Sequence, residues 1–306
     1  MRLGFSVKIY GRADLAAPMP SAHLSVHLAH WHDVLCYLRE KRLPMYRLET
    51  RFLAETEFLE ASSLRAVDEC AGQLAALGEL ARAAAVRLSF HPYSDVVLNS
   101  PNQAQADDSA SHLRVLAALL DAMTLGPEAV IVLHVGGVYD DLTTSAERFA
   151  RRYLALPEAV RRRVVLENDD HRFGYDAVRR IHAATSVPLV FDWLHHQVHN
   201  PAHEPWPEAL AHALTTWPPG VLPKVHYATP RTELRTLPGT GRIKLPTWTE
   251  HSDFVNPFAF VDFLRATAGL PPFDVMIECK ARDLAVLKLR EDVARYAPEF
   301  AEAVGE

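Results

Sequence analysis

Cysteine is scarce in this sequence, which has only Cys36, Cys70 and Cys279 among its 306 residues. Three scattered cysteines provide neither the disulfide framework of a small secreted domain nor the paired spacing of a zinc ribbon. We therefore expect these side chains to be reduced and to lie in the core.

Long apolar runs and targeting patterns are also absent. No run approaches the roughly 18 apolar residues that a membrane-spanning helix needs. Residues 1–5 do not have the pattern of a signal peptide. These absences predict a soluble, cytoplasmic protein without a membrane partner.

Two phosphate-binding motifs are missing, because the chain contains neither a GxGxxG turn nor a GxxxxGK(S/T) loop. A nucleotide cofactor is therefore not expected. The chain also lacks a basic excess, since 32 Lys and Arg against 38 Asp and Glu give a formal charge of −6. Contact with nucleic acid would have to come from a local basic region rather than from the whole surface.

What the sequence does contain is an alternation of short apolar runs with longer amphipathic stretches. This alternation is typical of βαβ units around a parallel sheet. We predict a single (β/α)8 TIM barrel over residues 1–306, of the α/β class, with a doubly wound sheet as the alternative fold. A barrel of this size needs no partner for stability, so we expect a monomer. The eight expected strands are 2–7, 45–50, 86–91, 129–134, 163–168, 187–192, 221–227 and 273–279.

Two helix starts and one long connection can be placed from local signals. Asn256 and Pro257 are expected to begin a helix, and Asp283 is expected to cap another over 283–296. Residues 228–250 form a connection without clear secondary structure. Long barrel loops are commonly functional, and the basic residues of this one are Arg231, Arg235, Arg242 and Lys244.

Side chains of metal-ligand types stand at or just after the expected strand ends. Because the carboxyl ends of barrel strands form the active-site face, we expect these side chains to meet in one site. Mixed imidazoles and carboxylates suit Mn²⁺, Zn²⁺ or Fe, and the oxygen ligands favour manganese. Eight ligands exceed the needs of one ion, so we expect two or three. The expected ligands are His91, His134, Glu167, Asp192, His195, His226, His251 and Glu278.

Glu167 and Glu278 end apolar runs, where a carboxylate is costly unless it is paired or coordinated. We expect both to hold a cation. The alternatives are ion pairs, with Arg163 for Glu167 and with Lys280 or Arg282 for Glu278. Similarly, instead of binding a metal, Asp192 could cap the turn that follows it, and His251 could cap the turn formed with Ser252 and Asp253.

Lys224 and His226 are two residues apart on an expected strand, so their side chains point the same way. An ammonium group among metal cations is repelled. We therefore expect Lys224 to have a strongly lowered pKa or to be carboxylated by carbon dioxide. We assign catalytic roles to Lys224, Glu167 and Glu278.

Eight short segments follow one another in a fixed order: 87–92, 97–101, 134–137, 166–169, 191–196, 224–226, 251–253 and 274–280. Together they resemble the UV damage endonuclease family. The resemblance implies a TIM barrel with a manganese cluster that nicks double-stranded DNA 5′ of ultraviolet photoproducts and some other lesions. It also implies that the eight residues named above are the ligands, and that Lys224 matches a lysine that the family can carry in carboxylated form.

The chain departs from the family at the residues expected to read the lesion. Where the family has Gly-Gln and an aromatic probe after His-Pro, this chain has Tyr93, Ser94 and Asp95. The substrate-reading residues are therefore altered, unless Tyr93 takes over as the wedge in place of that probe. The family's N-terminal Leu-Gly-Tyr is here Leu-Gly-Phe, and its Ser-Ser after the second strand is here Glu49 and Thr50. The expected DNA contacts are Phe5, Lys8, Arg51, Tyr93, Ser94, Asn99, Arg231, Arg235 and Arg242.

Three functions are compatible with this pattern. The first is a metal-dependent endonuclease acting on damaged DNA. The second is a small-molecule metalloenzyme, such as a sugar isomerase or epimerase on the same barrel, which the acidic charge and the missing probe support. The third is a nucleic-acid-binding barrel without catalysis.

Overall fold

The computed structural model describes residues 1–16, 23–50 and 60–305. Its parallel strands form a five-stranded sheet in the order β3-β2-β1-β10-β7 and a three-stranded sheet in the order β4-β5-β6. The strands are β1 Leu3–Ser6, β2 Met45–Arg47, β3 Arg87–Ser89, β4 Ile131–Leu133, β5 Val164–Glu167, β6 Leu189–Val190, β7 Lys224–Tyr227 and β10 Asp274–Ile277.

Two isolated parallel bridges join these sheets into a closed ring. Phe90 pairs with Ile131 between the end of β3 and β4, and Asp192 pairs with His226 between the end of β6 and β7. The first and last strands also pair, with Leu3 opposite Val275. A doubly wound sheet has two free edges, whereas this ring has none, so the predicted TIM barrel is confirmed and the alternative is wrong.

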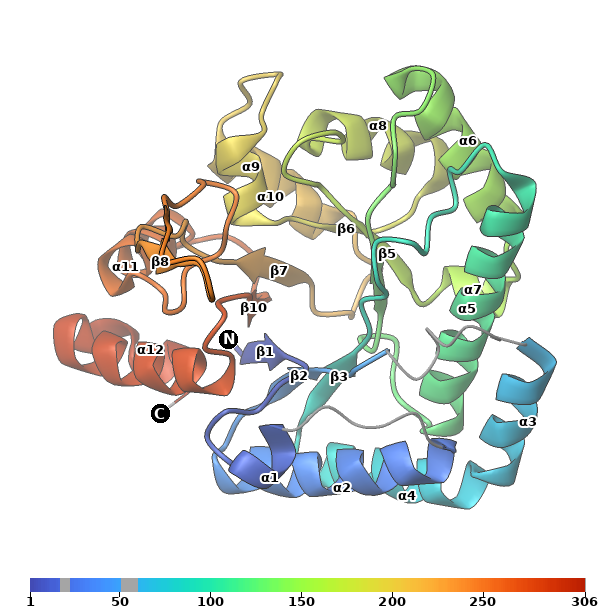
Figure 1. Ribbon diagram of the computed structural model, residues 1–306, viewed down its shortest axis with the longest axis horizontal. Coiled ribbons are helices and arrows are strands. Elements are labelled where there is room, and N and C mark those ends of the chain that lie inside the picture. The colour runs from blue at the N-terminus through green and yellow to red at the C-terminus, as the bar shows by residue number, and fades with distance from the viewer. Residues whose placement is uncertain (17–22, 51–59, 306) are drawn as a thin grey trace.

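Helices surround the ring of strands (Figure 1). They cover its outer face because the strands carry apolar side chains on both faces. The helices are α1 Ala13–Ala16, α2 Leu24–Glu40, α3 Glu60–Glu69, α4 Ala71–Ala83, α5 Gln103–Ala122, α6 Leu142–Ala155, α7 Glu158–Arg161, α8 Tyr175–Thr185, α9 Trp193–Val198, α10 Trp206–Thr215, α11 Pro257–Ala266 and α12 Asp283–Tyr296, with two 3-10 turns at Pro298–Phe300 and Glu302–Val304.

The two expected helix starts have different outcomes. Asn256 caps α11 by accepting from the amides of Phe258 and Ala259, as predicted. Asp283 does not cap α12: its carboxylate accepts from the amide of Tyr10 and from the hydroxyl of Tyr37. The predicted cap does not form because groups near the amino terminus of the chain bind this carboxylate instead.

An ion-pair network around the buried side chains of Arg87 and Asp274 closes the amino-terminal end of the ring. The carboxylate of Asp274 lies 2.9 Å from a guanidinium nitrogen of Arg87 and 2.8 Å from one of Arg2. Arg2 also pairs with Glu128 at 2.6 Å. These groups lie at the opposite end of the strands from the predicted site, so their role is to hold the ring together.

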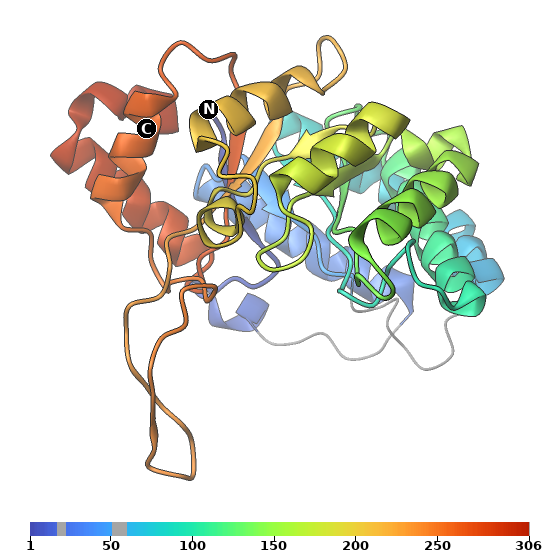
Figure 2. The ribbon, with the colours of Figure 1, turned by 90° about the horizontal axis from the view of Figure 1, so that it is seen from above.

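The sequence predicts no clear secondary structure in residues 228–250, the connection after β7. Part of this connection nevertheless forms a hairpin. Residues Arg235–Thr236 (β8) pair with Ile243–Lys244 (β9) in an antiparallel ladder. The resulting hairpin extends well beyond the barrel (Figure 2).

The structure bears on the predictions for the cysteines and for membrane-spanning helices. Cys70 and Cys279 are buried, Cys36 is half-buried, and all three are free thiols. Among the described residues, no helix is both long and apolar enough to cross a membrane.

Candidate metal centre

The eight expected ligands meet at the carboxyl ends of the strands. His91 and His134 follow β3 and β4, Glu167 ends β5, His226 lies on β7, and Glu278 follows β10. The other three, Asp192, His195 and His251, come from the start of α9 and from the base of the hairpin. The phase of the strands places them together, because each leaves its strand at the same edge of the ring.

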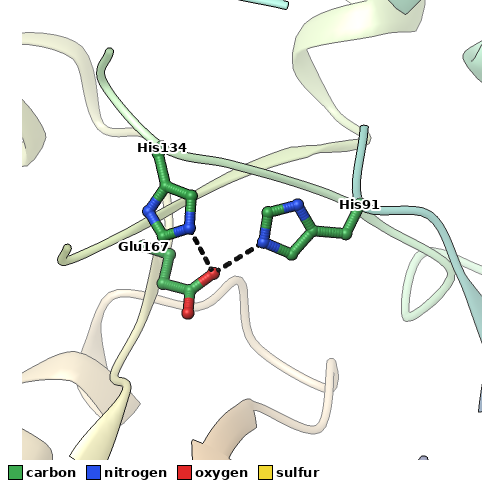
Figure 3. Close-up of side chains that lie close together, drawn as sticks. All are labelled: His91, His134 and Glu167. Atoms are coloured by element: carbon green, nitrogen blue, oxygen red, sulfur yellow. Dashed lines mark hydrogen bonds and ion pairs between the residues drawn. The ribbon is translucent and has the colours of Figure 1, made fainter. Parts of the chain in front are cut away.

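Glu167 lies in the middle of this cluster and is fully buried. One of its carboxylate oxygens is 3.0 Å from Nε2 of His91 and 3.6 Å from Nε2 of His134 (Figure 3). The other oxygen is 2.8 Å from Nδ1 of His226 and 3.6 Å from Nδ1 of His195. A single carboxylate therefore connects imidazoles from four elements, and the alternative pair with Arg163 does not form, since Arg163 binds Asp121.

Glu278 is the second carboxylate that connects several side chains of the cluster. Its carboxylate lies 3.2 Å from Nδ1 of His226 and 3.8 Å from Nδ1 of His251. It also forms an ion pair with Arg47, the last residue of β2. The alternative partners Lys280 and Arg282 are not the ones that bind it.

Asp192 both caps a helix and faces the cluster. Its Oδ1 accepts from the amide of His195 at 2.8 Å, as a cap of α9. Its buried Oδ2 has no hydrogen-bond partner among the described residues, and Nδ1 of His195 lies 3.7 Å away. A buried carboxylate oxygen without a donor is an expected ligand position for a cation.

The pKa values of Glu167 and Glu278 are shifted in opposite directions. Burial raises the pKa of Glu167 well above its usual value, and the nearby carboxylates of Glu278 and Asp192 raise it further. Glu278 is also buried, but Arg47 and His226 outweigh burial and hold the pKa of Glu278 well below its usual value. Without a bound cation, the cluster therefore has too little positive charge for all its carboxylates.

Three of the five expected ligand histidines have lowered pKa values, which favours their neutral form. Burial lowers the pKa of His91 and of His226 well below the ordinary value, and Arg47 lowers both further. Burial and the neighbouring His195 lower the pKa of His134 to about 4. Neutral imidazoles are the form that coordinates metals.

Lys224 lies deeper in the barrel than His226 and is fully buried. Its ammonium donates to Oγ of Ser89 at 2.9 Å. Burial, followed by the charges of Arg47 and Arg87, lowers the pKa of Lys224 well below the ordinary value. This is the direction expected from the sequence, although protein cations contribute to it before any metal does.

These donors fit divalent cations in two overlapping groups. Within each group, one ligand atom per residue lies within 4.8 Å of those of the other members. The first group is His91, His134 and Glu167, and the second is Glu167, Asp192, His226 and Glu278. Glu167 belongs to both groups.

A third acidic group was not predicted. Asp169, Asp170 and His171 follow β5 and also come within 4.8 Å of one another. However, Oδ1 of Asp169 accepts from the amides of residues 171, 172 and 173, which fix the loop. This group supports the chain that carries Glu167.

A cleft of about 780 Å³ lies over the cluster. Tyr93 and Ser94 line it, as expected for substrate contacts, and the Tyr93 hydroxyl donates to Glu49 at 2.7 Å. Lys8 is exposed on the loop after β1. Cationic side chains that line the cleft are Arg47, Arg172, Lys280 and Arg282.

Three expected DNA contacts are buried instead. Phe5 packs against Tyr46 in the core, with ring centroids 5.2 Å apart, so its ring is not available for stacking. Asn99 is buried and donates to the carbonyl of Gly137 at 2.7 Å, which supports the loop after β4. Arg231 is buried in an ion pair with Asp253. Arg235 and Arg242 lie on the hairpin, and Arg51 lies outside the described residues.

Arg47 is the main site residue that the sequence reasoning missed. Its Nη2 lies 3.2 Å from Nε2 of His226, and its side chain is only 11% exposed. The strand-end rule that found the ligands also applies to Arg47, since it ends β2. An arginine is not a metal-ligand type, so a search for ligands at the strand ends does not find it.

Comparison with known families gives one clear match. Residues 24–303 match the family described as UV-endonuclease UvdE. The UV DNA damage endonuclease of Bacillus mycoides is 29% identical over 265 residues, which cover 86% of this chain and 79% of that protein. The UV DNA damage endonuclease of Halalkalibacterium halodurans is 32% identical over 232 residues, which cover 74% and 67%.

Solved structures agree on the architecture. The crystal structure of SacUVDE aligns with a TM-score of 0.79 and 25% identity over 96% of this chain and 98% of that one. D-psicose 3-epimerase from Clostridium cellulolyticum H10 aligns over all of both chains with a TM-score of 0.56, but at 13% identity. The second likeness concerns the fold alone.

Proposed function

The chain belongs to the UV-endonuclease UvdE family, and we propose that it is a metal-dependent DNA endonuclease that nicks damaged duplexes 5′ of ultraviolet photoproducts and other lesions. One observation carries the metal-dependent part of this proposal. Imidazoles and carboxylates that are up to 187 positions apart (residues 91 to 278) surround Glu167 in a single buried cluster. Such a cluster is costly without cations.

We propose that two or three divalent cations bind here, held by His91, His134, Glu167, Asp192, His195, His226, His251 and Glu278. Mn²⁺ suits the mixture of nitrogen and oxygen ligands best, with Zn²⁺ or Fe as alternatives. When bound, such ions would act as Lewis acids for the phosphate and would lower the pKa of a coordinated water.

The side chains of this protein prepare the site for that chemistry. His91 and His226 stay unprotonated near neutral pH, because burial lowers the pKa of each. Glu278 stays ionised beside Arg47. The Arg47 guanidinium reaches the cluster from β2, pairs with Glu278 and also lines the cleft, where its positive charge would attract a phosphate.

Lys224 has a supporting role in the proposal. Its buried amine has a lowered pKa, and a neutral amine is the form that reacts with carbon dioxide. Carboxylation would convert a repelling cation into an anion beneath the ligands. In either form, Lys224 helps to balance charge rather than contacting the lesion.

Damaged double-stranded DNA is the proposed partner. The cleft combines cationic residues for phosphate with Tyr93 and Ser94 at its edge. We further propose that the protein works as a monomer in the cytoplasm. A sugar epimerase and a non-catalytic binder are not favoured, because the likeness to sugar epimerases is confined to the fold, whereas the UvdE match spans residues 24–303.

Nicking of a supercoiled plasmid tests the proposal. After treatment with a chelator and addition of Mn²⁺, the protein should relax ultraviolet-irradiated plasmid and leave unirradiated plasmid supercoiled. Glu69→Gln, at an exposed carboxylate on α3, is the control variant and should behave like the wild type. Retention of irradiated plasmid without nicking would instead support a binding protein.

A further inference from the structure

The hairpin after β7 is strongly basic in an acidic protein. Residues 234–249 contain Arg235, Arg242 and Lys244 and no Asp or Glu, whereas the whole chain has a formal charge of −6. The nearest carboxylates along the chain are Glu233 and Glu250. Glu250 lies 2.5 Å from Lys244 and 4.0 Å from Arg235. The outer part of the hairpin therefore presents positive charge only.

The same segment exposes large apolar side chains. Leu234, Ile243, Leu245 and Trp248 are 59%, 64%, 71% and 64% exposed. They make up four of the fourteen exposed large hydrophobics among the described residues, on one short piece of chain. Single exposed apolar residues need no explanation, but a cluster on a projecting element marks an interaction surface.

The base of the hairpin lies at the candidate metal centre. Pro230 and His251 form an antiparallel bridge at its base, and the amide of Arg231 donates to the carbonyl of Glu250 at 2.7 Å. Nδ1 of His251 lies 2.9 Å from the carbonyl of Glu278. As the connection from β7 to α11, the hairpin leaves the same face of the barrel as the ligands and projects away from it (Figure 2).

We propose that residues 231–250 form a DNA-binding arm whose apolar edge enters the duplex beside the cleaved bond. This inference rests on the proposed function and adds to it a second wedge besides Tyr93. Arg242 binds phosphate, while Trp248 and Leu245 stack against or separate base pairs. DNA matches both features of the arm. Its phosphates attract the positive charge, and its stacked bases can pack against the exposed apolar side chains.

The length of the arm sets how far from the nick it acts. From Arg231 to the turn at Gly239 the chain advances eight residues, which span at most about 26 Å when extended. At about 3.4 Å per base pair, this corresponds to roughly eight base pairs of duplex. The tip of the arm, with Arg242, therefore reaches DNA that flanks the lesion, whereas Trp248, three residues before His251 at the base, stays beside the cleft.

Binding to a duplex of about 30 base pairs, which exceeds this reach, tests the arm. The probe carries one thymine dimer and a neighbouring 2-aminopurine, and anisotropy is measured with chelator present so that no nicking occurs. Trp248→Ala should weaken binding at least about fivefold and abolish the rise in 2-aminopurine emission. Arg242→Ala should reduce the slope of log Kd against log salt by about 0.9, which reports one lost phosphate contact.

Matched controls lie elsewhere on the barrel. Leu154→Ala on α6 removes an exposed apolar side chain, and Arg265→Ala on α11 removes an exposed guanidinium. Both should bind the probe like the wild type.

The outcomes separate this inference from the proposed function. If the wild type nicks irradiated plasmid with Mn²⁺ but Trp248→Ala and Arg242→Ala bind like the controls, the arm proposal is overturned and the endonuclease proposal stands. If the wild type neither binds the probe nor nicks, the proposed function itself has failed. If Trp248→Ala instead converts an oligomer into a monomer by light scattering, with DNA binding unchanged, the edge is a contact between copies and the arm proposal is again wrong.

Discussion

The guanidinium of Arg47 forms an ion pair with the carboxylate of Glu278 inside the candidate metal centre. Both side chains are nearly buried, at 11% and 10% exposure. Arg47 is therefore a fixed cation next to a proposed metal ligand. It offsets part of the negative charge of the cluster, and a metal ion bound at the proposed site would share Glu278 with it.

Replacing Arg47 with Met should make the fold depend more strongly on metal. Without metal, Glu278 loses its cationic partner, and breaking a buried pair lowers the free energy of unfolding by about 3–5 kcal/mol. Saturating Mn²⁺ should restore much of this loss, since a ligand that binds only the folded state stabilises it. Thermal melts with chelator and with Mn²⁺ should show a larger Mn²⁺-induced rise in Tm than for the wild type. Arg282→Met is the control, because Arg282 lines the same cleft but donates to Ser6. An equal rise in Tm for Arg47→Met and the wild type would contradict this role.

Glu167→Gln should abolish nicking while leaving the barrel folded. Loss of a group that only supports a metal ligand costs about 10- to 100-fold, and removal of a carboxylate that touches several ligand histidines should cost more. The decrease should appear both in the nicking rate and in bound manganese measured by elemental analysis. Circular dichroism should match the wild type. Full nicking activity with normal metal content would show that Glu167 is not a ligand.

Neutralising Asp95 should strengthen binding to damaged DNA. Asp95 is exposed and directly follows Tyr93 and Ser94, which line the cleft where phosphate is expected. Two like charges at about 4 Å repel by about 1 kcal/mol in water, so Asp95→Asn should improve Kd by up to about fivefold at low salt. Asp95→Tyr should improve it further by adding a ring for stacking. Asp108→Asn, at an exposed carboxylate on α5, should leave Kd unchanged. Weaker binding by both Asp95 variants would exclude this edge from the DNA interface.

Asp274→Ala should destabilise the protein without disturbing metal binding. The substitution leaves Arg87 buried without its carboxylate, which costs about 3–5 kcal/mol. Urea denaturation should show this loss, while the manganese content of the folded protein stays at the wild-type level. Asp262→Ala on α11 is the control, since its carboxylate is exposed and binds only Arg265 among the described residues. Loss of metal together with stability would mean that the two ends of the barrel are coupled.

The sequence by itself determined the strands and the set of side chains at their ends. Apolar runs such as 129–134 and 163–168 are local patterns, and all eight expected runs contain a strand of the ring. The strand-end rule then identified His91, Glu167 and Glu278 as neighbours, because parallel strands in a closed ring share one carboxyl edge.

Only the tertiary structure decided the burial and the partners of individual side chains. Phe5, Asn99 and Arg231 looked like surface contacts but are buried, and Arg47 binds Glu278, which is 231 positions away. The pairing of β8 with β9 and the exposure of Trp248 are likewise properties of the folded chain. The physical reason is that strand formation and side-chain phase depend on near neighbours in the chain. Desolvation and ion pairing instead depend on groups that folding brings together from distant positions.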